Sequence, residues 1–206
     1  MNFTRKLILA SSSPRRQYLM REMGYLFNIK KPEVEEDFPA DLPAEHVAKY
    51  LSSKKAEFFR PSMQDEIILT ADTVVIINNK ILNKPNDRDE AISMLSELSG
   101  STHKVMTGVC IISKEKEDSF EETTQVTFKQ LTRKEIEFYI DRYQPYDKAG
   151  SYGAQDCLPR GMNPCSPEET AFLKTIHKTD LAENIIAPNL NEDCIVIIEK
   201  IDGSYF

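Results

Sequence analysis

IILTADTVVII, residues 67–77, is a run of Ile and Val broken only near its centre. This composition predicts a core β-strand, and Asn78 and Asn79 directly after it predict a hairpin turn. Asp72 lies inside the strand, where an unpaired carboxylate would cost several kcal/mol. A metal ion, a lysine such as Lys84, or a polarised water must therefore compensate its charge, and a polarised water is what a general base requires. A structural aspartate that bonds a turn is the alternative.

A second apolar run, Leu7 to Ala10, leads directly into the sequence SSSPRR. Ser13 suits a helix N-cap and Pro14 suits the first helical position, while Gly24 suits a left-handed cap after a helix that runs to about Met23. Free backbone N–H groups, the helix dipole and two guanidinium groups would converge at this helix start, which favours binding of a phosphate chain. An ordinary N-cap with two solvated arginines is the other interpretation.

Helices and strands alternate along the rest of the chain. Capping pairs mark two helix starts, Asp87 with Glu90 and Thr132 with Glu135. The expected elements are helices over residues 44–59, from Asp87 until Gly100 ends it, and over 132–143, and strands over 80–83, 104–112, 123–128 and 194–201. The apolar stripe of the first of these helices consists of Val47, Leu51 and Phe58, with Lys54 and Lys55 beside it. Such alternation predicts an α/β domain with a largely buried sheet.

Residues 156–192 interrupt this alternation because they are rich in proline, which cannot continue a sheet. One short helix, from Pro167 to about Lys178, is expected among them. We therefore interpret residues 156–192 as an insertion within a single domain that spans residues 1–206, placed near the mouth of a pocket because it begins just after Gln155.

The composition limits the classes of function. The chain has 206 residues, 40% of them hydrophobic, and a net charge of -7, which argues against general nucleic-acid binding. No segment resembles a signal peptide or a membrane span, and the cysteines form no C-x-x-C pair, so a cytoplasmic protein with reduced thiols is expected. All charged residues before the first acid, Glu22, are nevertheless basic, so this end of the chain should attract anions. They are Arg5, Lys6, Arg15, Arg16 and Arg21.

Glu35, Glu36 and Asp37 offer the hard oxygen ligands that Mg²⁺ or Mn²⁺ prefers, with substrate phosphates to complete the shell. A solvated acidic loop is the alternative. Lysines that could neutralise phosphate oxygens are Lys54, Lys55, Lys84 and Lys148. The histidines show no metal-ligand spacing.

Several short segments follow one another in a distinctive order. They are LILASSSPRR (7–16), EVEE (33–36), KKA (54–56), ADTVV (71–75), NKP (83–85), MLSELSGSTH (94–103), DKAGSYGAQ (147–155) and IDGSY (201–205). In this order they resemble the Maf-like family, the septum-formation-inhibitor proteins that act as nucleoside triphosphate pyrophosphatases. The resemblance implies a mixed, largely buried sheet flanked by helices, with two lobes and a cleft, and it allows for a homodimer.

The resemblance also implies cleavage of a nucleoside triphosphate between its α and β phosphates with a divalent cation, Mg²⁺ or Mn²⁺. The implied catalytic residues are Asp72, which would act on the attacking water, Glu35, Glu36 and Lys84. The implied metal ligands are Glu35, Glu36 and Asp72. The implied substrate-binding residues are Ser11, Ser13, Arg15, Arg16, Lys55, Thr73, Lys148 and Gln155. Attack at a phosphoryl centre needs mainly positioning and charge neutralisation, which these residue types supply.

Within the family, Arg15, Thr73 and Gln155 resemble the branch that hydrolyses dTTP and UTP, with modified pyrimidine nucleotides as further candidates. A glutamine amide can both donate and accept, so Gln155 could bind the O4/N3 edge of a pyrimidine. The sequence departs from the family pattern in the insertion and in the absence of a closing segment after Phe206, for which a shortened chain is the expected explanation.

Two other functions compete with this hypothesis. A non-catalytic regulator of septum formation or cell division would sense nucleotides with the same pocket, and an enzyme of the same fold could act on damaged purine triphosphates. Asp72 favours the enzyme, because an acid beside a bound triphosphate would repel it unless a metal or a proton transfer requires that acid.

Overall fold

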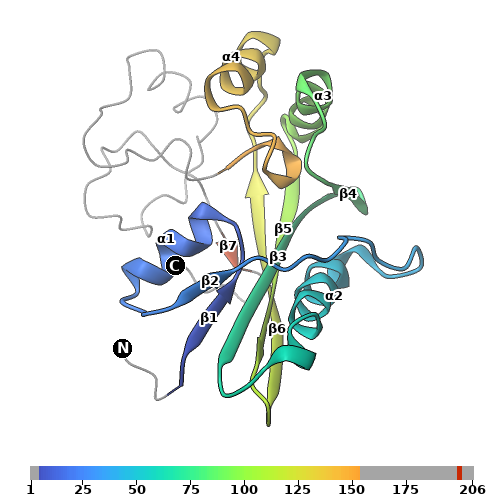
Figure 1. Ribbon diagram of the computed structural model, residues 1–206. Helices are drawn as coiled ribbons and strands as arrows, with labels where there is room; N and C mark the ends of the chain where they lie inside the picture. Colours follow the sequence, from blue (N-terminus) through green and yellow to red (C-terminus); the bar gives the residue numbers. More distant parts are fainter. Residues whose placement is uncertain (1–4, 154–198, 201–206) are drawn as a thin grey trace. The chain divides into compact units, whose positions relative to one another are not determined.

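The structure of the chain, a computed structural model, describes residues 5–153 and 199–200 (Figure 1). Its strands are β1 (Leu7–Ala10), β2 (Asn28–Lys30), β3 (Ile67–Ile77), β4 (Lys80–Leu82), β5 (Thr102–Ile112), β6 (Glu117–Thr127) and β7 (Glu199–Lys200). Its helices are α1 (Pro14–Glu22), α2 (Ala44–Glu57), α3 (Arg88–Leu98) and α4 (Arg133–Tyr143), with short 3₁₀ turns η1 (Arg60–Ser62) and η2 (Ala149–Ser151).

The strands form an open mixed sheet in the order β2-β1-β3-β5-β6-β7, and β4 pairs with β3. β1 lies between two parallel neighbours, β2 and β3, whereas the β3–β4 and β6–β7 pairs are antiparallel. The predicted mixed α/β fold is therefore confirmed.

The chain divides into two compact units. The first comprises Met1–Thr73 and Met106–Glu122, and the second comprises Val74–Val105 and Thr123–Phe206. The boundary between the units falls inside the long strands β3, β5 and β6. The single domain over residues 1–206 stays a prediction, and the insertion at 156–192 and its helix at 167–178 lie outside the described residues.

In the first unit, β1 leads into α1 as the sequence predicts. All four residues of β1 are buried, and α1 lies beside β1 and β2 in Figure 1. The Ser13 hydroxyl accepts a hydrogen bond from the Arg16 backbone N–H, with Pro14 at the first helical position. Gly24 has a φ of +75°, the left-handed conformation expected after the helix. These local signals therefore place the side chains of α1 at the end of β1.

Close contact with strands β3 and β5 holds helix α2 in the first unit. The hydroxyl of Thr70, in the middle of β3, donates to the carbonyl oxygen of Ser52 on α2 at 2.7 Å. A Cβ on Gly108 of β5 would lie 2.3 Å from the carbonyl carbon of Ala48, so only glycine permits this approach. The position of Lys55, on the last turn of α2, is consequently fixed relative to β3.

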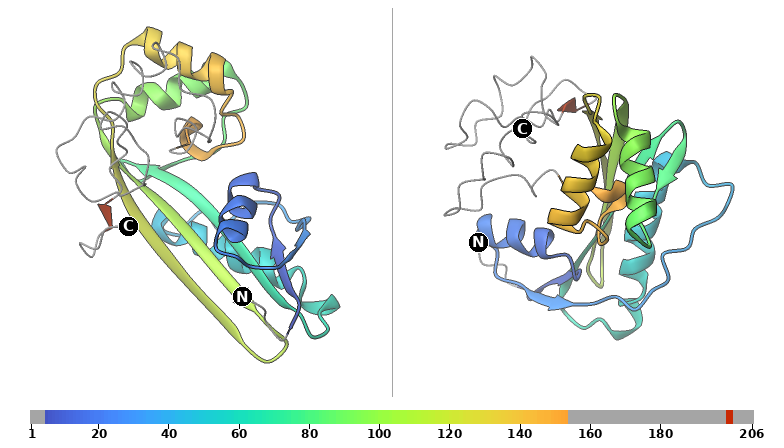
Figure 2. Two further views of the ribbon diagram at one scale, coloured as in Figure 1. Left: turned by 90° about the vertical axis from the view of Figure 1, so that its left-hand side faces the viewer. Right: turned by 90° about the horizontal axis from the view of Figure 1, so that it is seen from above.

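The second unit has its own core, formed by α3, α4 and the adjoining parts of β3 to β6. Helices α3 and α4 lie side by side (Figures 1 and 2). Both predicted capping pairs are confirmed: the Asp87 carboxylate accepts the Glu90 N–H at 2.9 Å, and Thr132 and Glu135 form a reciprocal capping box. The predicted hairpin is also present, with Asn78 and Asn79 both at positive φ.

Two sequence-based predictions were wrong in detail. Phe58 was expected in the apolar stripe of α2 but is 45% exposed, whereas Phe59 is buried. The α-helix ends at Glu57, and the following 3₁₀ turn changes the angular spacing of the side chains. The strand expected from residue 123 begins at Glu117. Its charged first half also pairs with β5 and is therefore part of the strand.

Candidate active site

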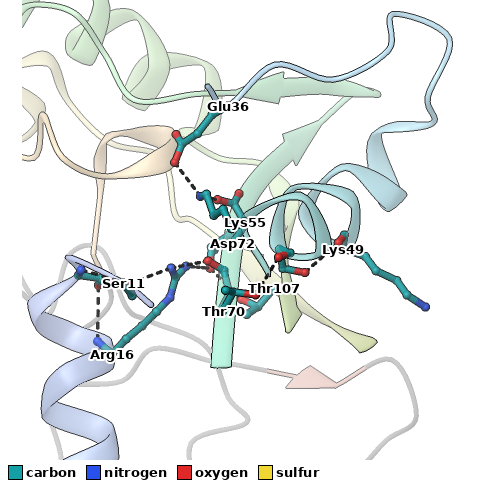
Figure 3. A network of polar contacts seen from close by, with 12 residues as sticks. Ser11, Arg16, Glu36, Lys49, Lys55, Thr70, Asp72 and Thr107 are labelled. Carbon is teal, nitrogen blue, oxygen red and sulfur yellow. Dashed lines mark hydrogen bonds and ion pairs between the residues drawn. The ribbon is translucent and has the colours of Figure 1, made fainter. Parts of the chain in front are cut away.

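Asp72 is ion-paired with Lys55 in the first unit (Figure 3). The side chains of Lys55 and Asp72 are only 9% and 12% exposed, and Lys55 Nζ also donates to Glu36 Oε1 at 2.7 Å. One ammonium group is therefore shared by a buried carboxylate and a half-exposed one. Of the compensating groups expected from the sequence, a lysine is present: Lys55 from α2 contacts Asp72.

Arg16 of α1 donates hydrogen bonds to both sequence neighbours of Asp72. Its Nη1 donates to the carbonyl oxygen of Ala71 at 2.7 Å, and its Nη2 donates to Thr73 Oγ1 at 3.0 Å. Burial lowers the pKa of the Arg16 guanidinium, and the charge of Asp72 opposes this shift. Two cationic side chains, from α1 and α2, are thus assembled around one aspartate of β3.

The start of α1 gathers further groups that suit an anion. Ser11 Oγ accepts the Ser13 backbone N–H at 3.2 Å and lies 3.5 Å from Arg16 Nη1. The positive charge of Arg15 contributes to the lowered pKa of Arg16, so the two guanidinium groups repel each other. A bound phosphate chain would relieve this repulsion and could accept from the helix N–H groups.

The acidic residues 35–37 interact with two different lysines of α2. Glu36 contacts Lys55, whereas Asp37 forms an exposed ion pair with Lys54 in which the hydrogen bond raises the pKa of Lys54 and lowers that of Asp37. Glu35 is exposed, and its charge acts on Lys54. The structure therefore distinguishes the two adjacent glutamates, because only Glu36 shares a partner with Asp72.

The carboxylates of Glu36 and Asp72 converge on one cation, the Lys55 ammonium. Within residues 5–153 and 199–200, no group of three or more His, Cys, Asp or Glu side chains could hold a metal by itself. Mg²⁺ is commonly bound by one or two carboxylates together with substrate phosphates. The donor set therefore fits a divalent cation that would be held jointly by protein and substrate.

Thr107 is a member of the network that sequence reasoning missed. Its Oγ1 lies 3.1 Å from Thr73 Oγ1, so the hydroxyl that accepts from Arg16 is itself fixed by β5. The structure shows alternating burial along β5, and a strand period of two is the rule that could have found Thr107. A period of two in residues 102–112 places Thr107 on the opposite face from the buried Met106.

The second unit holds Lys84 and Lys148, the other predicted lysines. Their segments are joined by a hydrogen bond from the Gly150 N–H to the Asn83 carbonyl oxygen, at 3.2 Å. Lys148 is buried, and its Nζ lies 2.9 Å from an Asp147 carboxylate oxygen. Gln155 lies outside the described residues, so its role stays a prediction.

Comparisons with known proteins indicate one family. The family model described as "Maf-like protein" matches residues 6–160. A protein of Porphyromonas gingivalis named "dTTP/UTP pyrophosphatase" is 49% identical over 157 residues, which cover 74% of this chain and 79% of that protein. Proteins of the same name from Bacteroides thetaiotaomicron (44% identical; 74% and 80% covered) and Thermotoga petrophila (45% identical; 73% and 74% covered) are also similar.

The helices in the described part of the chain are all too short or too polar to cross a membrane.

Proposed function

This chain belongs to the Maf-like family, and from that premise we propose that it hydrolyses dTTP and UTP to the nucleoside monophosphate and pyrophosphate. The observation that carries the proposal is the network in which Lys55 and Arg16 surround Asp72. Its residues lie within residues 6–160, the part of the chain that the family model matches. A purely structural aspartate would not require two cations, the buried Lys55 and the partly buried Arg16, from separate helices.

The proposed reaction needs a water, a base and groups that neutralise phosphate charge. The water oxygen attacks the α-phosphorus and its proton passes to the Asp72 carboxylate, while the bond from the α-phosphorus to the bridging oxygen breaks and pyrophosphate leaves. Lys55, Arg16 and Arg15 neutralise the charge that develops on the phosphate oxygens. Ser11 and Ser13 orient the phosphate chain at the start of α1.

A divalent cation, Mg²⁺ or Mn²⁺, fits the same proposal. Glu36 and Asp72 would hold it, with Glu35 as the further ligand expected from the sequence. When bound, the cation would polarise phosphate oxygens and offset their negative charge.

We expect purified protein to release pyrophosphate, and not orthophosphate, as the primary product from dTTP and UTP in the presence of Mg²⁺ or Mn²⁺. Attack at the α-phosphorus separates the β and γ phosphates as one unit. The measurement is a product assay with and without an added inorganic pyrophosphatase, across common and modified nucleotides. Orthophosphate as the first product would contradict the proposal, and tight nucleotide binding without turnover would instead favour the regulator.

Arg16→Ala is expected to lower kcat/KM for dTTP by about 10- to 100-fold, since hydrogen bonds to charged groups contribute about 1.5–3 kcal/mol. KM should rise and kcat should fall together, because the guanidinium contacts phosphate in both the ground and the transition state. Arg21→Ala, on the same helix, is the matched control and should retain near-normal kinetics. Equal kcat/KM in wild type and Arg16→Ala would place Arg16 outside the site.

A further inference from the structure

His103 and Tyr152 form a buried pair that the proposed chemistry does not use. His103 lies on β5 and is 2% exposed. Its Nε2 is 2.7 Å from the Tyr152 hydroxyl oxygen. The His103 ring contacts the rings of Phe128 and Tyr152 edge-on, with centroids 5.1 and 5.5 Å apart. A polar ring therefore occupies a position in the second unit that an apolar side chain could fill.

Both members of the pair are uncharged at neutral pH. Burial lowers the pKa of His103 from 6.5 to about 4, and burial raises the pKa of Tyr152. The contact is therefore a neutral hydrogen bond. His103 Nδ1 is buried without a hydrogen-bond partner among the described residues, an arrangement that costs stability. Because the imidazole costs stability, we look for another role for it. The only polar contact of the His103 side chain among the described residues is with the Tyr152 hydroxyl.

Tyr152 directly follows a turn that needs external support. Gly150 and Ser151 both have positive φ, at 68° and 62°, and Ser151 is fully buried. A Cβ on Gly150 would lie 3.0 Å from Val75 Cγ1. A non-glycine residue in the left-handed region persists only where its surroundings hold it. The turn therefore depends on its anchors to keep its shape.

Four contacts anchor this turn and the residues after it to three elements of the second unit and to the loop that follows β4. The Gly150 N–H donates to Asn83 at 3.2 Å, and the Ser151 hydroxyl contacts Met94 Sδ of α3 at 3.1 Å. The Gly153 N–H donates to the Tyr139 hydroxyl of α4 at 3.0 Å, and Tyr152 contacts His103 of β5. The same turn begins directly after Lys148, and its Asn83 contact is adjacent to Lys84. The anchors thus set the backbone position of both predicted phosphate-binding lysines of this unit.

We propose that His103 and Tyr152 are positioning residues whose hydrogen bond holds the turn at Ala149–Ser151 so that Lys148 is presented to the triphosphate. The inference rests on the proposed function, because it takes Lys148 as a substrate-binding residue. Neither His103 nor Tyr152 touches the substrate; both act through the lysine.

The test removes only the hydroxyl, with Tyr152→Phe, which keeps the ring packing. KM for dTTP should rise about tenfold, an effect in the range of one hydrogen bond, while kcat changes about twofold or less. In a Lys148→Ala background the same substitution should change KM less than about twofold, because coupled residues are not additive. Ile136→Val, in the same core but with no side-chain hydrogen bond to remove, is the control for a general loss of stability, and its KM should equal that of wild type.

Amide hydrogen exchange of the substrate-free protein provides a readout that needs no activity. Exchange at Gly150 and Gly153 should accelerate about tenfold in Tyr152→Phe and remain unchanged in Ile136→Val. Unchanged exchange, an unchanged KM in an active protein, or a full KM effect in the Lys148→Ala background would each overturn the proposal. A wild-type protein that releases no pyrophosphate would instead contradict the proposed function, whatever the exchange rates are.

Discussion

Asp72→Asn is expected to lower kcat for dTTP hydrolysis by about 100- to 10,000-fold, the usual contribution of a general base. The amide keeps the size of the side chain, and Lys55 retains Glu36 as an ionic partner, so the fold should survive. The side chains at positions 55 and 72 should remain packed between α2 and β3. The large effect should therefore fall on kcat and not on the yield of folded protein.

The matched control is Asp37→Asn, which makes the same chemical change in a neighbouring lysine–aspartate pair of the first unit. That pair is exposed and lies outside the Arg16–Asp72 network, so kcat should stay within about threefold of wild type, as expected for exposed ion pairs. Near-normal turnover of Asp72→Asn would mean that Asp72 is structural. The catalytic acid would then have to be Glu35 or Glu36.

Nucleotide titration separates the two catalytic roles open to Asp72. Removal of a negative charge near a triphosphate relieves repulsion of about 1–4 kcal/mol at separations near 4 Å. If Asp72 is the base, the variant should bind dTTP as tightly as wild type or more tightly, and Mg²⁺ should still strengthen binding. If Asp72 is a metal ligand, the dependence of binding on Mg²⁺ should be lost.

Local signals in the sequence were sufficient for most of the fold. Ser13, Asp87 and Thr132 cap their helices because a cap depends only on residues within one turn. Asn78 and Asn79 define the hairpin for the same reason, since positive φ is tolerated by asparagine in tight turns. Elements specified within a few residues are the elements that sequence patterns predict best.

Long-range pairing explains what the sequence did not predict. The sequence offered Lys84 as an example of a lysine that could compensate Asp72, and that role stays a prediction. The contact between Lys55 and Asp72 could not be predicted because it depends on α2 packing across β3, supported by the close approach at Gly108. The first half of β6 carries the sequence EDSFEE, whose charges gave no strand signal. Its backbone still pairs with β5, and backbone hydrogen bonds do not depend on side-chain polarity.

The candidate site likewise contains features that local sequence predicts and features that depend on long-range contacts. The serines and arginines of residues 11–16 could be assigned to a helix start from the sequence alone, and the structure agrees. The sequence could not choose between Glu35 and Glu36, which are adjacent and chemically alike. In the structure Glu36 contacts Lys55, and this contact depends on which carboxylate faces α2. The roles of Glu35 and Glu36 as metal ligands stay predictions.

Lys55→Met is expected to be the substitution that most reduces stability among those of the site. The two side chains of the Lys55–Asp72 pair are nearly buried, and removal of one partner from such a pair costs about 3–5 kcal/mol because the other charge remains desolvated. The attraction between Arg16 and Asp72 persists in the variant, so we expect a value near the lower end of that range. Chemical denaturation, with the free energy extrapolated to water, is the measurement.

Lys54→Met provides the matched control for this prediction. Lys54 precedes Lys55 on the same helix and also pairs with an aspartate, but its pair is exposed, so the unfolding midpoint should hardly change. The double variant Lys55→Met/Asp72→Asn should be more stable than Lys55→Met alone, because it no longer contains the unpaired carboxylate. Equal midpoints for the Lys54 and Lys55 variants, or a double variant less stable than Lys55→Met, would show that the stability of this site does not depend on neutralising Asp72. The cation at position 55 would then serve the substrate alone.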